Sequence, residues 1–247
     1  MADPAIPASL REQLRAAETS SFRRRLVLPF GIEAIDSRLT DGGFRLDSLH
    51  EIAGAGAHED DECAATLFAA GLAGRAWGPI LWVVRRRDLF APRVAQAGLD
   101  PKRIIYAEAS DDTELLAIME EGLRHQGLGA VIGEVQRIST NATRQLQRAA
   151  EGGRTIALLL KRHGRGGSAP LRAPSAAVTR WQVGRVPSES TPLAARSRAR
   201  WQLTLVHQRE GESFEIVVEA CDASGRCALP APTSRPGHRT QFPRAAA

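Results

Sequence analysis

Cysteine is scarce in this chain of 247 residues, which has only Cys63, Cys221 and Cys227. Three cysteines form no disulfide framework of the kind that supports small secreted domains. The six histidines are scattered and lack the spacing of a metal site, so we expect no bound metal. These absences favour a protein of the reducing cytoplasm.

Long apolar runs are also missing. No stretch approaches the roughly 18 apolar residues that a membrane helix needs, so we expect no membrane contact. The N-terminal sequence MADPAIPASL has no basic segment followed by an apolar one, which argues against a secretory signal. The 43% hydrophobic content is nevertheless sufficient for the core of one large domain.

Lysine is nearly absent, since Lys102 and Lys161 are the two lysines of a chain with 33 basic residues and a net charge of +5. Residues 1–151 hold 18 basic and 22 acidic side chains, a balance of −4. Residues 152–247 hold 15 basic and 6 acidic ones, a balance of +9. A basic C-terminal third is typical of binding to nucleic acid or to an acidic protein. Compositional drift in an arginine-rich chain explains the same numbers.

Hydrophobic periodicity predicts strands that alternate with helices as far as Lys161. The first expected strand ends near Ala53, and the later ones cover 80–84, 103–109, 130–135 and 155–161. The expected helices cover 60–75, 89–99, 111–125 and 139–151. Such alternation indicates right-handed βαβ units on a parallel sheet. The sequence therefore predicts an α/β fold with helices flanking a mainly parallel sheet.

The pattern changes after Lys161. A loop rich in Gly, Pro and Arg is expected over 162–174, and residues 176–184, 200–208 and 214–222 alternate as half-buried strands with no helix between them. They predict an antiparallel C-terminal β extension. We expect a core over 26–229, preceded by an amphipathic helix and basic linker (1–25) and followed by a disordered, basic, Pro-rich tail (230–247).

The stretch EIAGAGAHEDDECA (51–64) lies where a strand leads into a helix, as in a phosphate-binding loop of the form G-x-x-x-x-G-K-[ST]. Counting from Gly54, and passing Gly56, the loop enters an acidic run in which Glu59 and Glu62 are the flanking acids. Asp60 stands in the lysine's place and Asp61 in that of the hydroxyl residue. A like-charge pair about 4 Å apart costs roughly 4 kcal/mol at an intermediate dielectric, so ATP binding is disfavoured.

Acidic side chains are instead favourable at a helix start, because they interact with its dipole and free amides. We therefore expect these carboxylates to occupy the anion site themselves. A later strand ends at Glu134, which could bind Mg²⁺ in principle, and Asp88 is a displaced candidate for the water-activating acid. Since lysine and hydroxyl are both missing, we expect no catalytic residue, no cofactor and no ATPase activity.

Several stretches taken in order resemble a known family. The segment PFGIEAIDSRLTDGGFRLDSLHEIAG resembles the entry to a RecA-like core. GLDPKRIIYAEA, AVIGEV, TRQLQRAAE, PSAAVTRW and CDASGRCALP are similar to the ImuA family of RecA-like accessory proteins in bacterial damage-induced mutagenesis. The likeness covers about residues 26–230, and the order of the stretches makes it more specific than any one of them.

This resemblance implies partnership with ImuB, an inactive Y-family polymerase homologue, and with an error-prone C-family polymerase. It implies an adaptor in SOS-type DNA damage tolerance and translesion synthesis, cytoplasmic and nucleoid-associated on DNA damage, with possible contact to RecA and single-stranded DNA. The alternatives are a DNA-stimulated RecA-type ATPase and a regulator of recombinase filaments.

Candidate contact residues fall into two groups. Arginines of the basic C-terminal third are candidates for binding DNA or a partner protein: Arg162, Arg165, Arg172, Arg196, Arg198, Arg200, Arg235, Arg239 and Arg244. Apolar residues of the N-terminal segment are candidates for self-association into a homo-oligomer or docking onto a recombinase: Leu10, Leu14, Phe22 and Phe30.

Overall fold

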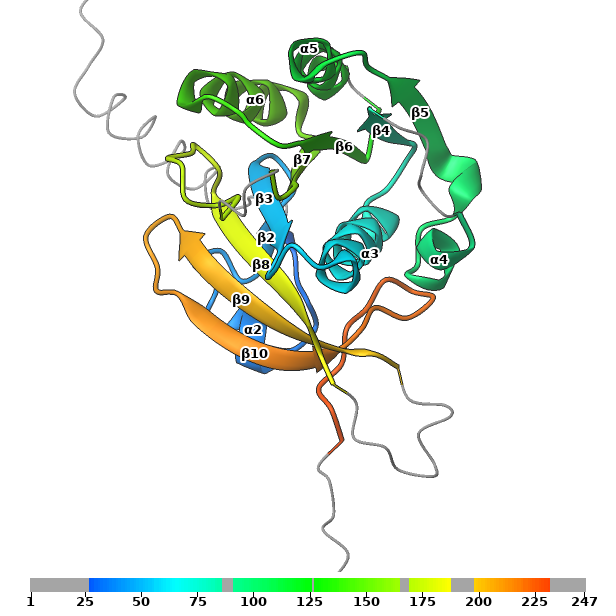
Figure 1. Ribbon diagram of the computed structural model, residues 1–247, viewed down its shortest axis with the longest axis vertical. Coiled ribbons are helices and arrows are strands. Elements are labelled where there is room, and N and C mark those ends of the chain that lie inside the picture. Colours follow the sequence, from blue (N-terminus) through cyan, green and yellow to red (C-terminus); the bar gives the residue numbers. More distant parts are fainter. Residues whose placement is uncertain (1–26, 86–90, 126, 165–168, 188–197, 232–247) are drawn as a thin grey trace, which may run out of the picture.

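A computed structural model describes residues 27–85, 91–125, 127–164, 169–187 and 198–231. Its centre is an eight-stranded sheet with the order β10-β9-β8-β3-β7-β6-β4-β5 (Figure 1). The strands of this sheet are β3 (Leu49–Gly54), β4 (Ile80–Val84), β5 (Ile104–Glu108), β6 (Ala130–Val135), β7 (Ile156–Lys161), β8 (Thr179–Val186), β9 (Arg200–Gln208) and β10 (Phe214–Glu219). Two short strands, β1 (Val27–Leu28) and β2 (Phe44–Arg45), pair separately.

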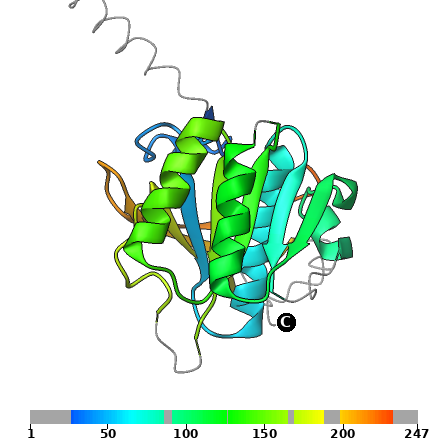
Figure 2. The same ribbon diagram turned by 90° about the horizontal axis from the view of Figure 1, so that it is seen from above.

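Helices cover the parallel part of the sheet on both faces. α5 and α6 lie together on one face, as Figure 2 shows, and α3 packs on the other face against β3 and β8. The helices are α2 (Glu33–Asp36), α3 (Glu59–Arg75), α4 (Ala91–Gln96), α5 (Asp112–Arg124) and α6 (Thr140–Gly153), with a 3₁₀ turn, η1 (Pro101–Arg103), before β5. Strands buried on both faces have continuous apolar sequences, which is why β4 (ILWVV) and β7 (IALLLK) show no alternation.

The C-terminal strands extend the sheet with the opposite polarity. β8 runs parallel to β3, whereas β9 is antiparallel to β8 and β10 antiparallel to β9. Trp201, Leu203 and Leu205 of β9 face the core, and the intervening residues are more exposed, as strict alternation requires. The architecture is therefore the α/β RecA-like core predicted from the sequence, with its antiparallel extension.

An aromatic cluster anchors the entry segment to the face that α3 covers. The Phe30 ring is 3% exposed, and its centroid lies 5.1 Å from that of Phe44 and 5.5 Å from that of Trp181. Phe68 of α3 joins the same cluster. Phe30 is therefore a core residue, and its prediction as an exposed self-association contact was wrong. Leu10, Leu14 and Phe22 lie outside the described residues.

Most predicted elements lie within a few residues of their observed bounds. The expected helix 89–99 is observed as Ala91–Gln96, and the expected strand 214–222 ends at Glu219, where a turn begins. The helix expected over 8–19 and the tail 230–247, apart from residues 230 and 231, lie outside the described residues. No helix in the described ranges combines the length and apolarity needed to cross a membrane.

Candidate functional site

The degenerate nucleotide loop connects β3 to α3, as the sequence predicts. The chain passes from Gly54 through Gly56 to His58, the residue that precedes α3. Gly54 is closely packed, because a Cβ atom there would lie 3.0 Å from the Glu62 backbone nitrogen. All four residues of the first helical turn are acidic: Glu59, Asp60, Asp61 and Glu62.

These acids do not cap α3 in the way the sequence suggested, because His58 is the N-cap residue and no side chain makes a cap hydrogen bond. The Oδ1 atom of Asp61 instead accepts a hydrogen bond from the Arg185 backbone nitrogen on β8, at 2.8 Å. Asp60 forms an exposed ion pair with the Arg185 guanidinium at 2.6 Å. The carboxylates fill the loop, but they bind a neighbouring strand rather than the amides of their own helix.

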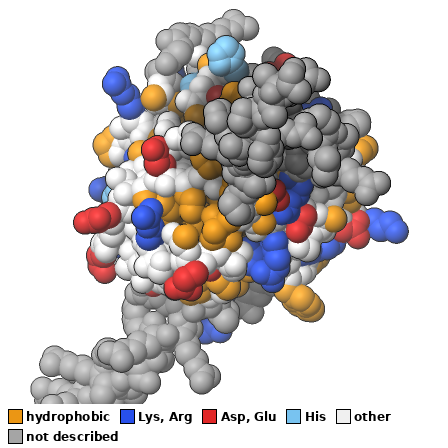
Figure 3. All heavy atoms as spheres, turned by 90° about the horizontal axis from the view of Figure 1, so that it is seen from below, with side chains coloured by type: hydrophobic (Ala, Val, Ile, Leu, Met, Phe, Trp, Pro, Cys, Tyr) orange, Lys and Arg blue, Asp and Glu red, His pale blue; other side chains and the backbone are white. Residues whose placement is uncertain are grey.

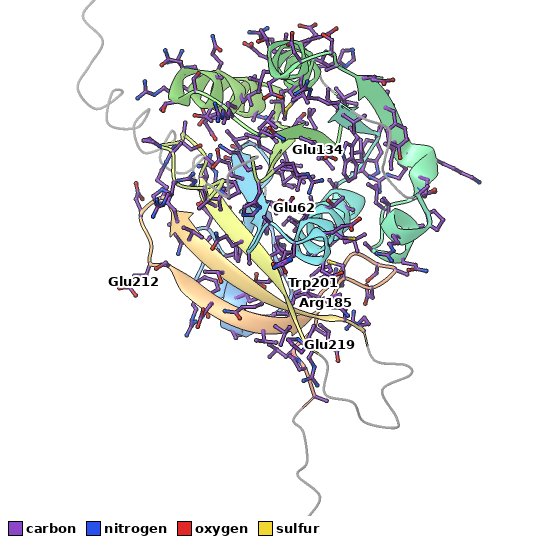
Figure 4. All side chains as sticks on the ribbon, viewed as in Figure 1. Glu62, Glu134, Arg185, Trp201, Glu212 and Glu219 are labelled. Atoms are coloured by element: carbon purple, nitrogen blue, oxygen red, sulfur yellow. The ribbon has the colours of Figure 1, made fainter. Side chains whose placement is uncertain are left out.

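Glu62, which the sequence analysis treated only as a flanking acid, points into the site. Its Oε2 lies 2.9 Å from Arg162 Nη1, and its Oε1 lies 2.6 Å from His163 Nδ1. Arg162, at the end of β7, also donates from Nε and Nη2 to the Oε2 atom of Glu134, at 3.1 and 2.8 Å. Figure 4 shows Glu62 and Glu134 near one another beside α3. The Arg162 guanidinium therefore lies between the start of α3 and the acid that ends β6.

Every donor group of Arg162 has a partner in this cluster. Nη1 also donates to the Glu62 carbonyl at 3.0 Å, and Nη2 to Thr66 Oγ1 at 2.8 Å. The other oxygen of Glu134, Oε1, accepts from the indole nitrogen of Trp82 at 3.1 Å. The side chains of Arg162, Glu62 and Glu134 are 23%, 20% and 16% exposed. We define the Arg162 cluster as Arg162, Glu62, Glu134, Thr66, Trp82 and His163.

The electrostatics of the Arg162 cluster favour its charged state. Partial burial alone would raise the pKa of Glu62, but hydrogen bonds from His163 and Arg162 outweigh it and hold the pKa below its usual value. Burial alone would lower the pKa of Arg162, but the Glu134 carboxylate reverses this and raises it. The cluster is thus a fixed set of charges in which one guanidinium bridges two carboxylates.

Both oxygens of Glu134 are engaged by protein donors, so this acid has no oxygen left over for a Mg²⁺ ion. An arginine cation occupies the neighbourhood that an ATPase gives to metal and phosphate. Within the described part of the chain, no three His, Cys, Asp or Glu side chains are placed to hold a metal ion. Asp88, the displaced candidate acid, lies outside the described residues.

The basic C-terminal third is less available than its charge suggested. Arg162 is engaged in its cluster rather than in a free loop, which leaves its guanidinium no unpaired donor group for the predicted contact with DNA or a partner. Arg198 pairs with Glu219 at 2.9 Å and with Asp222 at 3.3 Å. Arg200 is half-buried on β9, and Arg172 is exposed. The remaining candidates lie outside the described residues: Arg165, Arg196, Arg235, Arg239 and Arg244.

Other basic residues of this third are also neutralised. Arg180 on β8 is 8% exposed and donates to the fully buried Glu51 at 2.7 Å. On the face that Figure 3 shows, acidic and basic side chains are interspersed among the described residues. Charge counting could not reveal these pairs, because each joins residues far apart in the sequence.

The sequence analysis missed an apolar groove between α5 and the sheet edge. It is lined chiefly by Leu81, Ile105, Ala117, Ile118 and Leu128, and has a volume of about 510 Å³. β5 pairs with β4 on one side, and no described residue pairs with its other side. Ile105 is 51% exposed on this strand. The sequence predicts a strand over 103–109, but nothing in it marks this strand as the edge of the sheet.

An exposed tryptophan lies near one end of this groove. Trp77, just after α3, is 92% exposed. Its carbonyl packs against Gly129, where a Cβ atom would lie only 2.2 Å from the Trp77 oxygen. The adjoining residue Leu128 lines the groove. We call Trp77 and the groove residues the edge surface; it is the kind of apolar patch that protein interfaces use.

Comparison with known proteins gives the family. No protein-family model matches the chain. The curated Protein ImuA from two strains of Caulobacter vibrioides is 34% identical over 206 residues, which cover 80% of this chain and 84% of the relative. Identity at this level over most of both chains is sufficient to assign a family, and the RecA-like fold agrees with it. The chain belongs to the ImuA family.

Proposed function

We propose that the protein is a non-catalytic RecA-like adaptor in damage-induced mutagenesis. In this role it bridges an ImuB-like inactive Y-family polymerase homologue and an error-prone C-family polymerase, with the recombinase and single-stranded DNA as further candidate partners. Membership of the ImuA family supports a role in damage-induced mutagenesis. The Arg162 cluster supports the absence of catalysis, and it is the observation that carries the proposal.

Three groups that a RecA-like ATPase needs are altered together here: the lysine, the hydroxyl residue and the metal-binding acid. Asp60 and Asp61 hold the positions of the lysine and the hydroxyl, and each is tied to Arg185. Glu134 is held by Arg162 and Trp82. To admit Mg-ATP, the protein would have to break the Arg162 ion pairs and leave Glu62 and Glu134 without partners. Separating one member of a part-buried pair from the other is strongly unfavourable.

Calorimetric titration with Mg-ATP tests this half of the proposal. We expect no binding at nucleotide concentrations up to about 1 mM, a range that detects binding with a free energy of about −4 kcal/mol or more favourable. A catalytically active recombinase measured in the same buffer is the control. Micromolar binding, or ATP hydrolysis that is lost in Glu134→Gln, would favour the alternative of a DNA-stimulated ATPase.

The adaptor half needs a docking surface, and we place it on the edge surface rather than on the basic C-terminal third. We propose that an extended segment of the ImuB-like partner binds there. It adds a strand to β5 and inserts an apolar side chain between Ile105 and Ile118. Main-chain hydrogen bonds give affinity in such strand addition, and pockets for alternate side chains give specificity. Glu114 and Glu121 border the groove, so basic residues beside the apolar anchor would complement it.

Co-purification of the two proteins, followed by binding measurements on matched variants, tests this placement. Ile105→Glu puts a charge on the exposed edge of the groove, and we expect it to weaken partner binding by at least about tenfold. Val217→Glu is the matched control, since Val217 is an exposed apolar strand residue (37%) on the opposite edge strand, β10. Equal binding by both variants would remove the edge surface as the docking site.

A regulator of recombinase filaments remains the second candidate for the same surface. The discriminating measurement is competition: unlabelled recombinase should not displace the ImuB-like protein if the adaptor proposal is right. Displacement together with loss of recombinase binding in Ile105→Glu would assign the edge surface to the recombinase instead.

A further inference from the structure

Cys221 and Cys227 lie against each other beside a tight turn. Their Sγ atoms are 3.4 Å apart, and both side chains are part-buried and free. The segment that holds them is a small hairpin, in which the Glu219 backbone nitrogen donates to the Ala228 carbonyl at 2.8 Å. The two thiols therefore meet because the backbone on both sides of the turn is paired, and not through a chance contact of loose loops.

The turn between the cysteines is held by a single carboxylate. Asp222 Oδ1 accepts from the backbone nitrogens of Ser224 and Arg226, at 2.9 and 3.1 Å, and from the Ser224 hydroxyl at 2.6 Å. Gly225 adopts φ +73°, which suits glycine, and any side chain there would strike the Gly71 carbonyl. The hairpin is thus rigid, and it seats the C-terminal extension on α3.

We propose that Cys221 and Cys227 form a reversible intramolecular disulfide when the protein meets a peroxide, and that this bond fixes the turn of the hairpin that packs on α3. A disulfide requires a sulfur separation of about 2.05 Å, so the two sulfurs need to approach by a little over 1 Å. Rotation of the side chains can supply this, because the paired backbone already brings the two residues together. This site and its chemistry are independent of the nucleotide loop and of the edge surface.

The two thiols have different parts in the reaction. The hydrogen bond with Cys227, followed by burial, raises the pKa of Cys221, which disfavours the Cys221 thiolate. We therefore assign the attack on an oxygen of hydrogen peroxide to Cys227. The O–O bond breaks, hydroxide leaves and takes up the proton that Cys227 released, and Cys227 becomes a sulfenic acid.

Cys221 then attacks the sulfenic sulfur. The S–O bond of Cys227 breaks, hydroxide leaves with the Cys221 proton as water, and the S–S bond forms. Two thiols have lost two electrons and two protons, and one peroxide has become two waters. The adjacent thiol makes the second step fast, and it protects Cys227 from irreversible oxidation.

Alkylation of the full-length protein, followed by mass spectrometry, tests the proposal. Before oxidation we expect all three cysteines of the chain to be labelled under denaturing conditions, and after peroxide only Cys63. The intact mass should fall by about 2 Da, and a thiol reductant should restore it. Arg226 lies inside the ring, so trypsin should yield two peptides joined by the bond in the oxidised protein and separate in the reduced one.

Matched variants make the result decisive. Cys63→Ser should keep the loss of two thiols, whereas Cys221→Ser should stop at a sulfenic acid or a glutathione adduct on Cys227. Oxidised wild type should unfold about 3–8 °C above reduced wild type, and Cys227→Ser should show no such difference. Retention of all three thiols after peroxide, or a bond to Cys63 or between two chains, would overturn the proposal.

Discussion

Among the residues that the structure describes, the Arg162 side chain donates hydrogen bonds to Glu62, Thr66 and Glu134 and so connects three elements. Arg162→Met keeps an unbranched side chain of similar apolar stem but leaves Glu62 and Glu134 without their cation. We expect the free energy of unfolding to fall by about 2–4 kcal/mol, less than for a fully buried pair because these groups retain some solvent contact. Urea unfolding at neutral pH measures it. Arg172→Met, at an exposed position, should stay within about 0.5 kcal/mol of wild type.

His50 on β3 predicts a pH dependence. It is fully buried, and its pKa is lowered to about 4 by burial. Its Nδ1 lies 2.8 Å from Thr179 Oγ1 and its Nε2 lies 2.8 Å from the Arg45 carbonyl. Since that carbonyl can only accept, Nε2 carries the proton. The Thr179 hydroxyl accepts from Trp181 Nε1 at 2.8 Å and so is left to donate to Nδ1. A second ring proton has no acceptor in this chain of bonds.

The sign of the effect follows from the lowered pKa. Below pH 6.5 the unfolded chain binds a proton at His50, whereas the folded protein does not until about pH 4. Stability should therefore fall as the pH is lowered through this window, by about 3 kcal/mol in total for this residue. Denaturant titrations from pH 4.5 to 7.5 measure the slope. His50→Gln should flatten it, and parallel profiles for the two proteins would contradict this account.

Residue types and spacing could predict which residues enter the nucleotide loop but not what binds them. Asp60 and Asp61 were found because a phosphate-binding loop has a fixed spacing. Arg185 could not be assigned to Asp60, nor Arg162 to the neighbouring Glu62, because these contacts join residues 125 and 100 positions apart. Side-chain burial decides such pairings, and a sequence pattern contains no information on distance.

At the scale of elements, the start of α3 is tied to β8 through two unequal contacts. Asp61→Ala removes the acceptor of the Arg185 backbone nitrogen, and we expect it to cost about 1–2 kcal/mol. Asp60→Ala removes only an ion pair between side chains that are 56% and 66% exposed, so it should cost less than about 1 kcal/mol. Thermal or urea unfolding of both variants checks the order. The reverse order would mean that the acids act mainly by charge repulsion.

Element types were predictable wherever hydrophobic periodicity was strong. β4, β6 and β7 are apolar runs, and α6 begins at a Ser139 whose hydroxyl accepts from the Ala142 nitrogen, as the sequence indicated for a capped helix. The end of β10 was missed because hydrophobic residues continue into the cysteine hairpin. There a turn fixed by Asp222 and Gly225 outweighs the apolar pattern.

At the scale of the whole molecule, the described core begins at Val27, and Phe30 belongs to it. Deleting residues 1–25 should therefore leave the melting temperature unchanged, whereas Phe30→Ala should cost about 3–5 kcal/mol through the cavity it leaves. If Leu10, Leu14 and Phe22 mediate self-association, light scattering should show a smaller mass per particle for the deletion. Equal masses would assign the N-terminal segment no part in oligomerisation.

The order of strands could be predicted only in part. Alternating helices and strands imply a parallel sheet, but not that β3 lies between β7 and β8, or that β5 forms an edge. That order depends on which apolar faces match after the helices have packed. The edge surface follows from it, which is why residues such as Ile105 could not be identified as exposed from the sequence.

The position of β3 also has a consequence for how the protein is made. Both of its partners are encoded far downstream: β7 begins at Ile156 and β8 ends at Val186. A ribosome must therefore synthesise about two thirds of the chain before β3 can pair with β7, and about three quarters before it can pair on both sides. Until then its apolar residues stay unpaired, and long-range strand pairing is slow and leaves such segments open to aggregation. Rapid translation under stress, when chaperones are in demand, should lower the yield of this protein more than that of one with local strand pairing.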